Sequence, residues 1–249
     1  MDATQPGGIA LIGFDADDTL WKSEDYYRTA QAEFERIVGE YVDIADVAER
    51  LYAVEKRNIA LFGYGVKGMV LSMVETAVAI TDARITATDI HRIVQMGKEL
   101  LRHPVELLPG VREAVVEVAR EFPVVLITKG DLFHQEAKVR GSGLADLFGR
   151  IEIVSEKDPA TYARVLGEFD IAPSQFLMVG NSMRSDIAPV LELGGWGVHV
   201  PYHVSWVHDM LETIPTDVTR MRSVDAIDQL AAAARELAAL AAQSGASQS

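Results

Sequence analysis

The sequence of 249 residues contains no cysteine, which excludes disulfide bonds, thiolate metal sites and thiol catalysis. It also has few basic residues: 23 Lys and Arg stand against 37 Asp and Glu, and the formal net charge is −14. A chain this acidic lacks a broad electrostatic attraction to nucleic acid or to an anionic membrane, so we expect neither as a partner. Local cations must therefore draw in any anionic substrate.

The sequence also lacks long apolar runs, and none approaches the length that crosses a bilayer. Residues 1–8 have neither the basic flank nor the apolar stretch of a signal peptide, which predicts a cytoplasmic protein. The tails, 1–8 and 244–249, are expected to be disordered. What the chain does have is a hydrophobic content of 49%, enough for a sizeable globular core.

Two kinds of segment follow each other along the chain. Residues 22–103 have a helical pattern almost throughout, whereas strands and helices alternate after residue 104 and an Ala-rich helix is expected at 224–242. Because such alternation indicates a doubly wound parallel sheet, the apolar strand 9–14 must join that sheet. We predict an α/β fold with a discontinuous Rossmann-like core, 1–21 and 104–249, and an inserted all-helical domain, 22–103.

The apolar strand 9–14 ends abruptly in Asp15, Asp17 and Asp18. The carboxyl end of a buried parallel strand is where α/β proteins place their ligand sites. Asp15 and Asp17 are close enough to share one divalent metal, and their mutual repulsion would be costly without it. An acidic turn that caps the next element is the alternative. Trp21, at the exit from this loop, is interpreted as a packing or flap residue that could also line a pocket.

Two later strand ends carry residue types that suit a phosphate site. Thr128, Lys129 and Gly130 supply a hydroxyl, a cation and loop N–H groups that can hold phosphoryl oxygens. Lys157 can neutralise a phosphoryl oxygen and hold a carboxylate in place. A helix-capping threonine and a solvated surface lysine are the alternatives.

A third strand end carries Asn181 and, five residues later, Asp186. Oxygen ligands at this spacing suit magnesium, although Asp186 could instead cap the helix expected at 186–193.

Taken together, D-x-D-x-T, then Thr, then Lys, then G-N-S-x-x-S-D, each after an apolar strand, resembles the haloacid dehalogenase (HAD) superfamily of hydrolases. The resemblance spans residues 9–186 and implies that the helical block is a C1-type cap, a lid over the site. It makes Asp15 the nucleophile that forms an aspartyl-phosphate. It makes Asp17 the general acid and base, whose backbone carbonyl also binds the metal.

The same resemblance assigns the phosphoryl group to Thr128 and Lys157, and Mg²⁺ to Asp15, Asp17 and Asp186. Asn181 stands where many relatives carry Asp, which removes one negative charge near the metal. The function implied is magnesium-dependent hydrolysis of a small phosphorylated metabolite.

Asp17 favours this over carbon–halogen cleavage, because an alkoxide needs a proton to leave and a halide does not. A phosphomutase, a 2-haloacid dehalogenase-like hydrolase and a non-catalytic binding protein on the same scaffold stay open, as do monomer and homodimer.

Two further patterns carry less weight. Gly63–Gly68 matches the dinucleotide fingerprint G-x-G-x-x-G, but it follows a helical stretch instead of a strand. A cap loop that presents Lys67 to the substrate and a plain helix–helix turn are the two remaining interpretations. His199, His203 and His208 are interpreted as ordinary polar residues and not as a metal cluster.

Overall fold

The computed structural model describes residues 8–204 and 219–246, and the chain divides into two compact units. One unit comprises residues 1–22, 105–129 and 139–249, and the other comprises residues 23–104 and 130–138. The sequence analysis predicts a helical domain at 22–103, whose bounds differ by one residue at each end from those of the segment 23–104. Residues 130–138, expected in the α/β core, group with the helices, where Asp131 pairs with Lys67.

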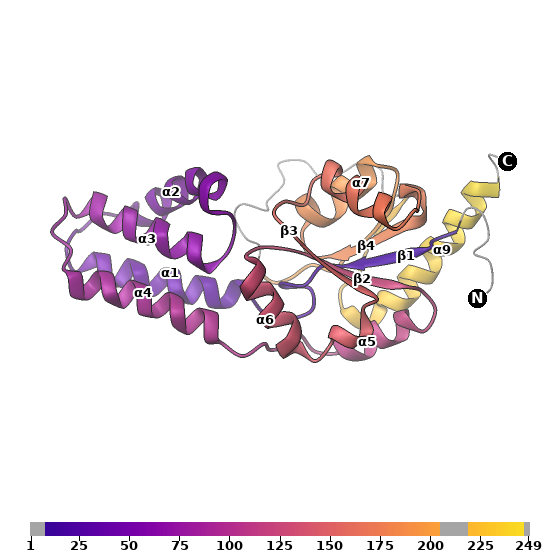
Figure 1. Ribbon diagram of the computed structural model, residues 1–249, viewed down its shortest axis with the longest axis horizontal. Helices are drawn as coiled ribbons and strands as arrows, with labels where there is room; N and C mark the ends of the chain where they lie inside the picture. Colours follow the sequence, from indigo (N-terminus) through magenta and orange to yellow (C-terminus); the bar gives the residue numbers. More distant parts are fainter. Residues whose placement is uncertain (1–7, 205–218, 247–249) are drawn as a thin grey trace. The chain divides into compact units, whose positions relative to one another are not determined.

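The α/β unit contains a sheet of six parallel strands in the order β3-β2-β1-β4-β5-β6 (Figure 1). These are β1 (Leu11–Phe14), β2 (Val124–Lys129), β3 (Arg150–Val154), β4 (Phe176–Gly180), β5 (Trp196–His199) and β6 (Met221–Ser223). Phe14 is in register with Leu126 of β2 and Val179 of β4, so the carboxyl ends of the three central strands lie at one edge. The predicted doubly wound parallel fold is confirmed; only the three-residue edge strand β6 was not foreseen.

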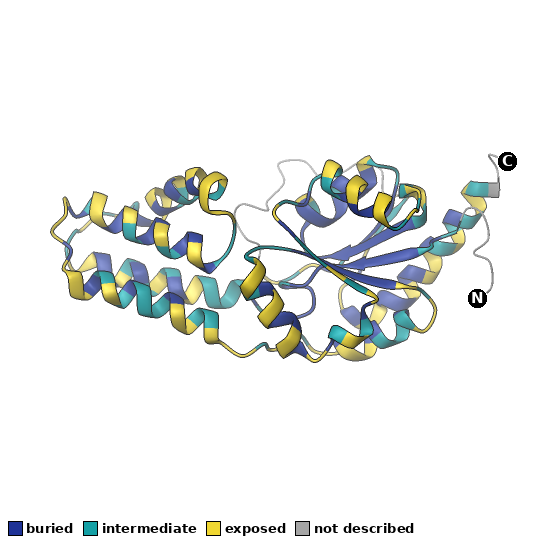
Figure 2. Ribbon diagram, viewed as in Figure 1, coloured by how far each residue is buried: buried dark blue, intermediate teal, exposed yellow. Residues whose placement is uncertain are grey.

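Helices cover both faces of this sheet, whose central strands β1, β2 and β4 are mostly dark blue in Figure 2. They are α5 (Val111–Ala119), α7 (Pro159–Glu168), α8 (Ala188–Glu192) and α9 (Leu230–Ala246). A further helix, α6 (Leu132–Ser142), begins in the helical unit and ends in this one, where Val139 packs in the core. Ile12 packs in a cluster with Leu237 of α9, whereas the adjacent Leu11 packs with Tyr162 of α7 on the other face. Burial on both faces explains why β1 is continuously apolar instead of alternating.

The Ala-rich segment forms α9 and continues to Ala246, so the expected tail at 244–249 is helical for its first three residues. Residues 1–7 and 247–249 of the expected tails lie outside the described residues.

The helical unit is built from α1 (Glu24–Gly39), α2 (Val47–Phe62), α3 (Val66–Ile80) and α4 (Ala87–Arg102). Its apolar core includes fully buried side chains from all four helices: Phe34, Leu51, Met73 and Ile93. Across the described residues, no helix has the length and apolarity to span a bilayer.

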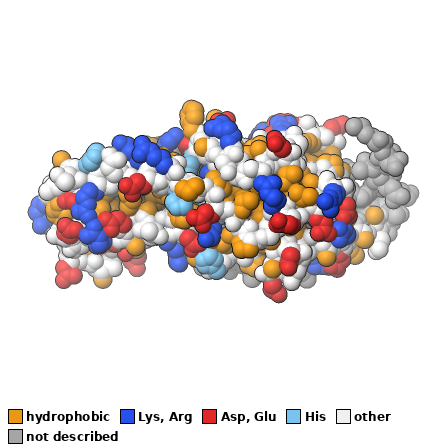
Figure 3. Space-filling view, turned by 90° about the horizontal axis from the view of Figure 1, so that it is seen from below, with side chains coloured by type: hydrophobic (Ala, Val, Ile, Leu, Met, Phe, Trp, Pro, Cys, Tyr) orange, Lys and Arg blue, Asp and Glu red, His pale blue; other side chains and the backbone are white. Residues whose placement is uncertain are grey.

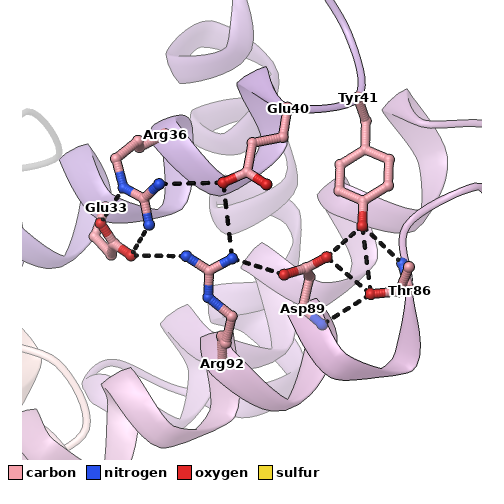
Figure 4. Close-up of polar contacts among 7 residues, drawn as sticks. All are labelled: Glu33, Arg36, Glu40, Tyr41, Thr86, Asp89 and Arg92. Carbon is pink, nitrogen blue, oxygen red and sulfur yellow. Dashed lines mark hydrogen bonds and ion pairs between the residues drawn. The ribbon is translucent and has the colours of Figure 1, made fainter.

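A polar network joins α1 to α4 inside this unit (Figure 4). Arg92 of α4 forms ion pairs with Glu33 of α1 and with Asp89 in its own first turn. The Tyr41 hydroxyl donates to the Asp89 carboxylate, as do Arg92 and Thr86, and together these bonds lower the pKa of Asp89 to about 2. The network therefore fixes the start of α4 against the end of α1.

Charges of both signs are interspersed on the surface drawn in Figure 3. Some of the exposed pairs connect distant segments of the α/β unit, such as Arg235 with Glu117 and Glu121. Solvent screens exposed pairs of this kind, so these surface charges contribute little to the stability of the fold.

Candidate active site

Asp15 follows β1 directly, at the edge where the strands end. Its N–H donates to the carbonyl of Val179 at 2.8 Å, which continues the β1–β4 ladder by one residue. Lys157, in the loop after β3, donates from Nζ to Asp15 Oδ1 at 2.5 Å and to Asp186 Oδ1 at 2.7 Å. All three side chains are buried, and Lys157 is only 4% exposed. The structure thus brings together three residues that the sequence places after three different strands.

The buried charges of Asp15, Lys157 and Asp186 favour the binding of a further cation. Burial acts to lower the pKa of the Lys157 ammonium, but the charges of Asp15 and Asp186 outweigh it and the pKa is raised. Burial and the negative charge of Asp15 raise the pKa of Asp186 to about 7, even though Lys157 opposes the shift. One lysine does not neutralise two buried carboxylates, which is the setting that favours a bound cation.

Asp186 lies in a π-helical turn, Met183–Ile187, and not at the start of the α-helix expected over 186–193. A continuous α-helix would need the N–H of residue 189 to reach the carbonyl of Ser185. Pro189 has no N–H, and the Ser185 carbonyl instead accepts the Tyr162 hydroxyl at 3.0 Å. Both the sequence and the packing therefore contribute to this turn, and π-helical turns are frequent at functional sites.

Backbone contacts hold the Asp186 carboxylate against the end of β4. The Ser182 N–H donates to Asp186 Oδ2 at 2.9 Å. A Cβ atom at Gly180 would lie 2.2 Å from that same oxygen. Only glycine at position 180 leaves room for the carboxylate in this position.

Thr19 connects the nucleophile loop to the Asn181 loop. Its hydroxyl donates to Asp15 Oδ2 at 2.9 Å, lies 3.1 Å from Asn181 Oδ1, and accepts the Asn181 N–H at 3.0 Å. Thr19 was not among the site residues predicted from the sequence, although the last letter of D-x-D-x-T marks it. Together with Lys157, it gives each oxygen of the Asp15 carboxylate a donor.

Asp17 is partly buried, and its Oδ1 accepts the indole N–H of Trp21 at 2.6 Å. The loop between them is tight: Asp18 has a φ of 62°, and the Trp21 N–H donates to the carbonyl of Ala16 at 3.3 Å. Trp21 itself is fully buried in the core, so it packs there and does not line an open pocket.

The residues at the carboxyl end of β2 and directly after it divide between the two units. Thr128 is buried at the end of the strand. The Lys129 ammonium lies 3.1 Å from Ser185 Oγ and 3.8 Å from the Glu156 carboxylate, beside the turn that holds Asp186. Gly130 has a φ of 148° and belongs to the segment that groups with the helices.

Lys67 belongs to the helical unit, near the start of α3. Its ammonium lies 2.9 Å from both carboxylate oxygens of Asp131 and 5.1 Å from the centre of the Phe133 ring. Gly63, with a φ of 72°, ends α2, and Gly65, with a φ of 108°, precedes α3. The segment is a helix–helix connection without the preceding strand of a dinucleotide site, and a substrate contact by Lys67 stays a prediction.

The histidines make ordinary polar contacts where they are described. His199 Nε2 lies 3.1 Å from the carbonyl oxygen of Asn181, and Nδ1 lies 3.3 Å from Ser223 Oγ. Burial lowers the pKa of His199. His208 lies outside the described residues.

The oxygen donors of this site fit a hard divalent cation. Asp15 and Asp186 supply carboxylates, Asn181 supplies an amide oxygen, and Asp17 follows two residues after Asp15. Within the described parts of the chain, no three His, Cys, Asp or Glu side chains form a ready-made metal cluster. This donor set is sufficient for magnesium, because protein-bound Mg²⁺ usually keeps several waters and needs only one or two carboxylate ligands.

Comparison with known proteins agrees with this architecture. Residues 9–194 match the family model described as haloacid dehalogenase-like hydrolase. The chain is 55% identical to a haloacid dehalogenase-like family hydrolase from Xanthomonas campestris, over 97% of both chains, with a TM-score of 0.88.

More distant structures share the fold. A 2-haloacid dehalogenase from Pseudomonas syringae is 22% identical over 92% of this chain and 99% of its own, with a TM-score of 0.59. The HAD-hydrolase YfnB from Bacillus subtilis, solved with magnesium, is 16% identical over 90% of this chain and 97% of its own, with a TM-score of 0.59. A search of curated proteins finds no match. By its family match and by its close structural relative, this chain belongs to the haloacid dehalogenase-like hydrolases.

Proposed function

We propose that this hydrolase cleaves a small phosphomonoester with magnesium, through an aspartyl-phosphate on Asp15. The observation that carries the proposal is the Asp15 carboxylate at the end of β1, with Lys157 on one oxygen, Thr19 on the other and Asp17 two residues further on. A carboxylate held in this way is pre-positioned for attack, and most of the rate gain in phosphoryl transfer comes from positioning and charge neutralisation.

In the first step an Asp15 oxygen attacks phosphorus, the new O–P bond forms and the ester P–O bond breaks. Asp17 gives its proton to the departing alkoxide. The ammonium groups of Lys157 and Lys129 offset the charge of the transferring phosphoryl group, and the Thr128 hydroxyl donates a hydrogen bond to it. Lys157 stays paired with the nucleophile.

In the second step a water molecule attacks phosphorus and gives a proton to Asp17. The O–P bond to Asp15 breaks, the Asp15 carboxylate is regenerated and phosphate leaves. Magnesium, held by Asp15, Asp186, Asn181 and the Asp17 carbonyl, would neutralise phosphoryl oxygens throughout.

Asp17 is the residue that separates this reaction from carbon–halogen cleavage. A dehalogenase has no need of a proton donor, since halide leaves unaided. A phosphomutase would return the phosphoryl group to a sugar, and a binding protein would have no use for a nucleophile and an acid together. We further propose that residues 23–104 act as the cap, that Lys67 contacts the substrate and that the protein works in the cytoplasm.

The test is a phosphate-release screen over metabolite phosphates, with and without magnesium. Asp15→Asn should abolish turnover, because an amide does not attack phosphorus, whereas Asp17→Asn should form phosphoenzyme slowly and stall. Asp170→Asn is the matched control: Asp170 is exposed, and asparagine tolerates its φ of 55°. Substantial turnover by Asp15→Asn would remove the nucleophile. Halide release from 2-haloacids, without phosphate release, would replace the proposal with the dehalogenase.

A further inference from the structure

We propose that Trp21 is a positioning residue, whose indole N–H holds the Asp17 carboxyl group in the orientation from which its proton passes to the leaving group. The inference rests on the acid–base role proposed for Asp17.

The contact itself is short and specific. Trp21 Nε1 lies 2.6 Å from Asp17 Oδ1, and an indole has this single N–H to donate. Bonds from N–H groups to carboxylates are shorter and about twice as strong as neutral ones. A bond of this kind fixes the carboxylate at one of its oxygens.

The tryptophan is the rigid partner of the pair. Trp21 is fully buried in the main core cluster, whereas Asp17 is only partly buried. The backbone on either side is held in place: the Leu108 N–H donates to the Leu20 carbonyl at 2.9 Å, and the Lys22 N–H donates to the Glu106 carbonyl at 3.0 Å. The core therefore fixes the position of Trp21, and Trp21 in turn fixes the orientation of the Asp17 side chain.

Packing alone does not account for tryptophan at position 21, since phenylalanine also fills an apolar core. The chain contains a matched case in Trp196, at the start of β5, which is 5% exposed and donates from Nε1 to the Ser174 carbonyl at 2.9 Å. Both tryptophans are buried and both make one indole hydrogen bond, but only Trp21 directs its bond to a predicted catalytic group. Trp196→Phe is therefore the control for Trp21→Phe.

Proton delivery matters most when the leaving group is a strong base. An alkoxide depends on the acid, whereas an activated phenolate such as 4-nitrophenolate leaves almost unaided. The parameter kcat/KM reports only the steps up to phosphoenzyme formation, so the shared hydrolysis step does not mask the difference.

Trp21→Phe should lower kcat/KM for alkyl phosphates by about tenfold to a hundredfold, a part of the roughly 10²–10⁴-fold contribution of general acid catalysis. For 4-nitrophenyl phosphate the loss should stay below about threefold. Asp17→Asn should show the same split in larger measure, and Trp21→Phe should add little to it in the double variant. Trp196→Phe should show no split.

Equal losses on both substrates for Trp21→Phe, beside a clear split for Asp17→Asn, would overturn the positioning role alone. Absence of the split in Asp17→Asn itself would overturn the acid role and the positioning role together.

A second measurement does not require Trp21→Phe to fold. The protein has three tryptophans, so selective ¹⁵N labelling gives three indole N–H resonances, assigned by replacing the other two with phenylalanine. Asp17→Asn should shift the Trp21 resonance strongly and leave that of Trp196 in place. An unmoved Trp21 resonance would overturn the proposal.

Discussion

Replacement of Lys157 by methionine removes the ammonium that bridges Asp15 and Asp186 while it keeps a side chain of similar length. The ammonium donates to both carboxylates, at 2.5 and 2.7 Å, and all three groups are buried. Loss of one partner from a buried ion pair leaves an uncompensated charge and costs about 3–5 kcal/mol. For a chain of this size that corresponds to a fall in Tm of roughly 6–20 °C.

Thermal unfolding in chelator would measure this loss. Lys22→Met is the matched control, because Lys22 pairs with Glu106 at 3.1 Å on the surface, where a pair contributes about 0–1 kcal/mol. Adding Asp186→Asn to Lys157→Met should restore much of the stability, since only one buried carboxylate then remains.

The pH dependence of this loss of stability is an independent test of the bridging role. Burial and the negative charge of Asp15 raise the pKa of Asp186, and without Lys157 nothing from that ammonium opposes the shift. The Lys157→Met defect should therefore be largest above that raised pKa and shrink as pH falls towards about 4. If Lys157→Met melts within a degree or two of Lys22→Met and keeps full turnover, the bridging role is wrong.

Two further predictions concern the metal and the cap. In metal-free protein, Asp186, with its pKa raised to about 7, contributes stability that is complete below the ordinary carboxyl range and lost as pH rises through about 7. Melting curves between about pH 5 and 9 should show this fall, and either magnesium or Asp186→Asn should remove it; an unchanged slope in Asp186→Asn would contradict the assignment. Lys67→Ala should lower kcat/KM for the preferred metabolite about tenfold to a hundredfold, as loss of a charge-assisted contact of about 1.5–3 kcal/mol would, and should affect an aryl phosphate far less. If both substrates lose equally little, Lys67 serves only its pair with Asp131.

The sequence by itself determined the elements and the edge at which chemistry is expected. Burial of β1 on both faces is visible in its unbroken apolar run, and the alternation after residue 104 predicts the parallel sheet that the structure contains. Strand direction then requires Asp15, Lys157 and Asp186 to lie at the same edge. These inferences succeed because periodicity and apolar runs record burial residue by residue.

Only the tertiary structure decided which side chains meet and how. Lys157 reaches Asp15 across 142 residues of chain, and Thr19 reaches Asn181 across 162. The sequence alone therefore does not identify Thr19 as the residue that links the Asp15 loop to the Asn181 loop. Pairings of this kind depend on strand order and register, which leave no local trace in the pattern of the sequence.

The same limit applies where local rules predict a different structure. The rules predict an α-helix at 186–193, but Pro189 together with the Tyr162–Ser185 bond produces a π-helical turn. From the sequence, Trp21 cannot be told apart from an ordinary packing residue. Only the structure shows that its N–H donates to Asp17. Hydrophobic pattern records how deeply a residue is buried, whereas the partner of a polar atom is set by segments that folding brings from far along the chain.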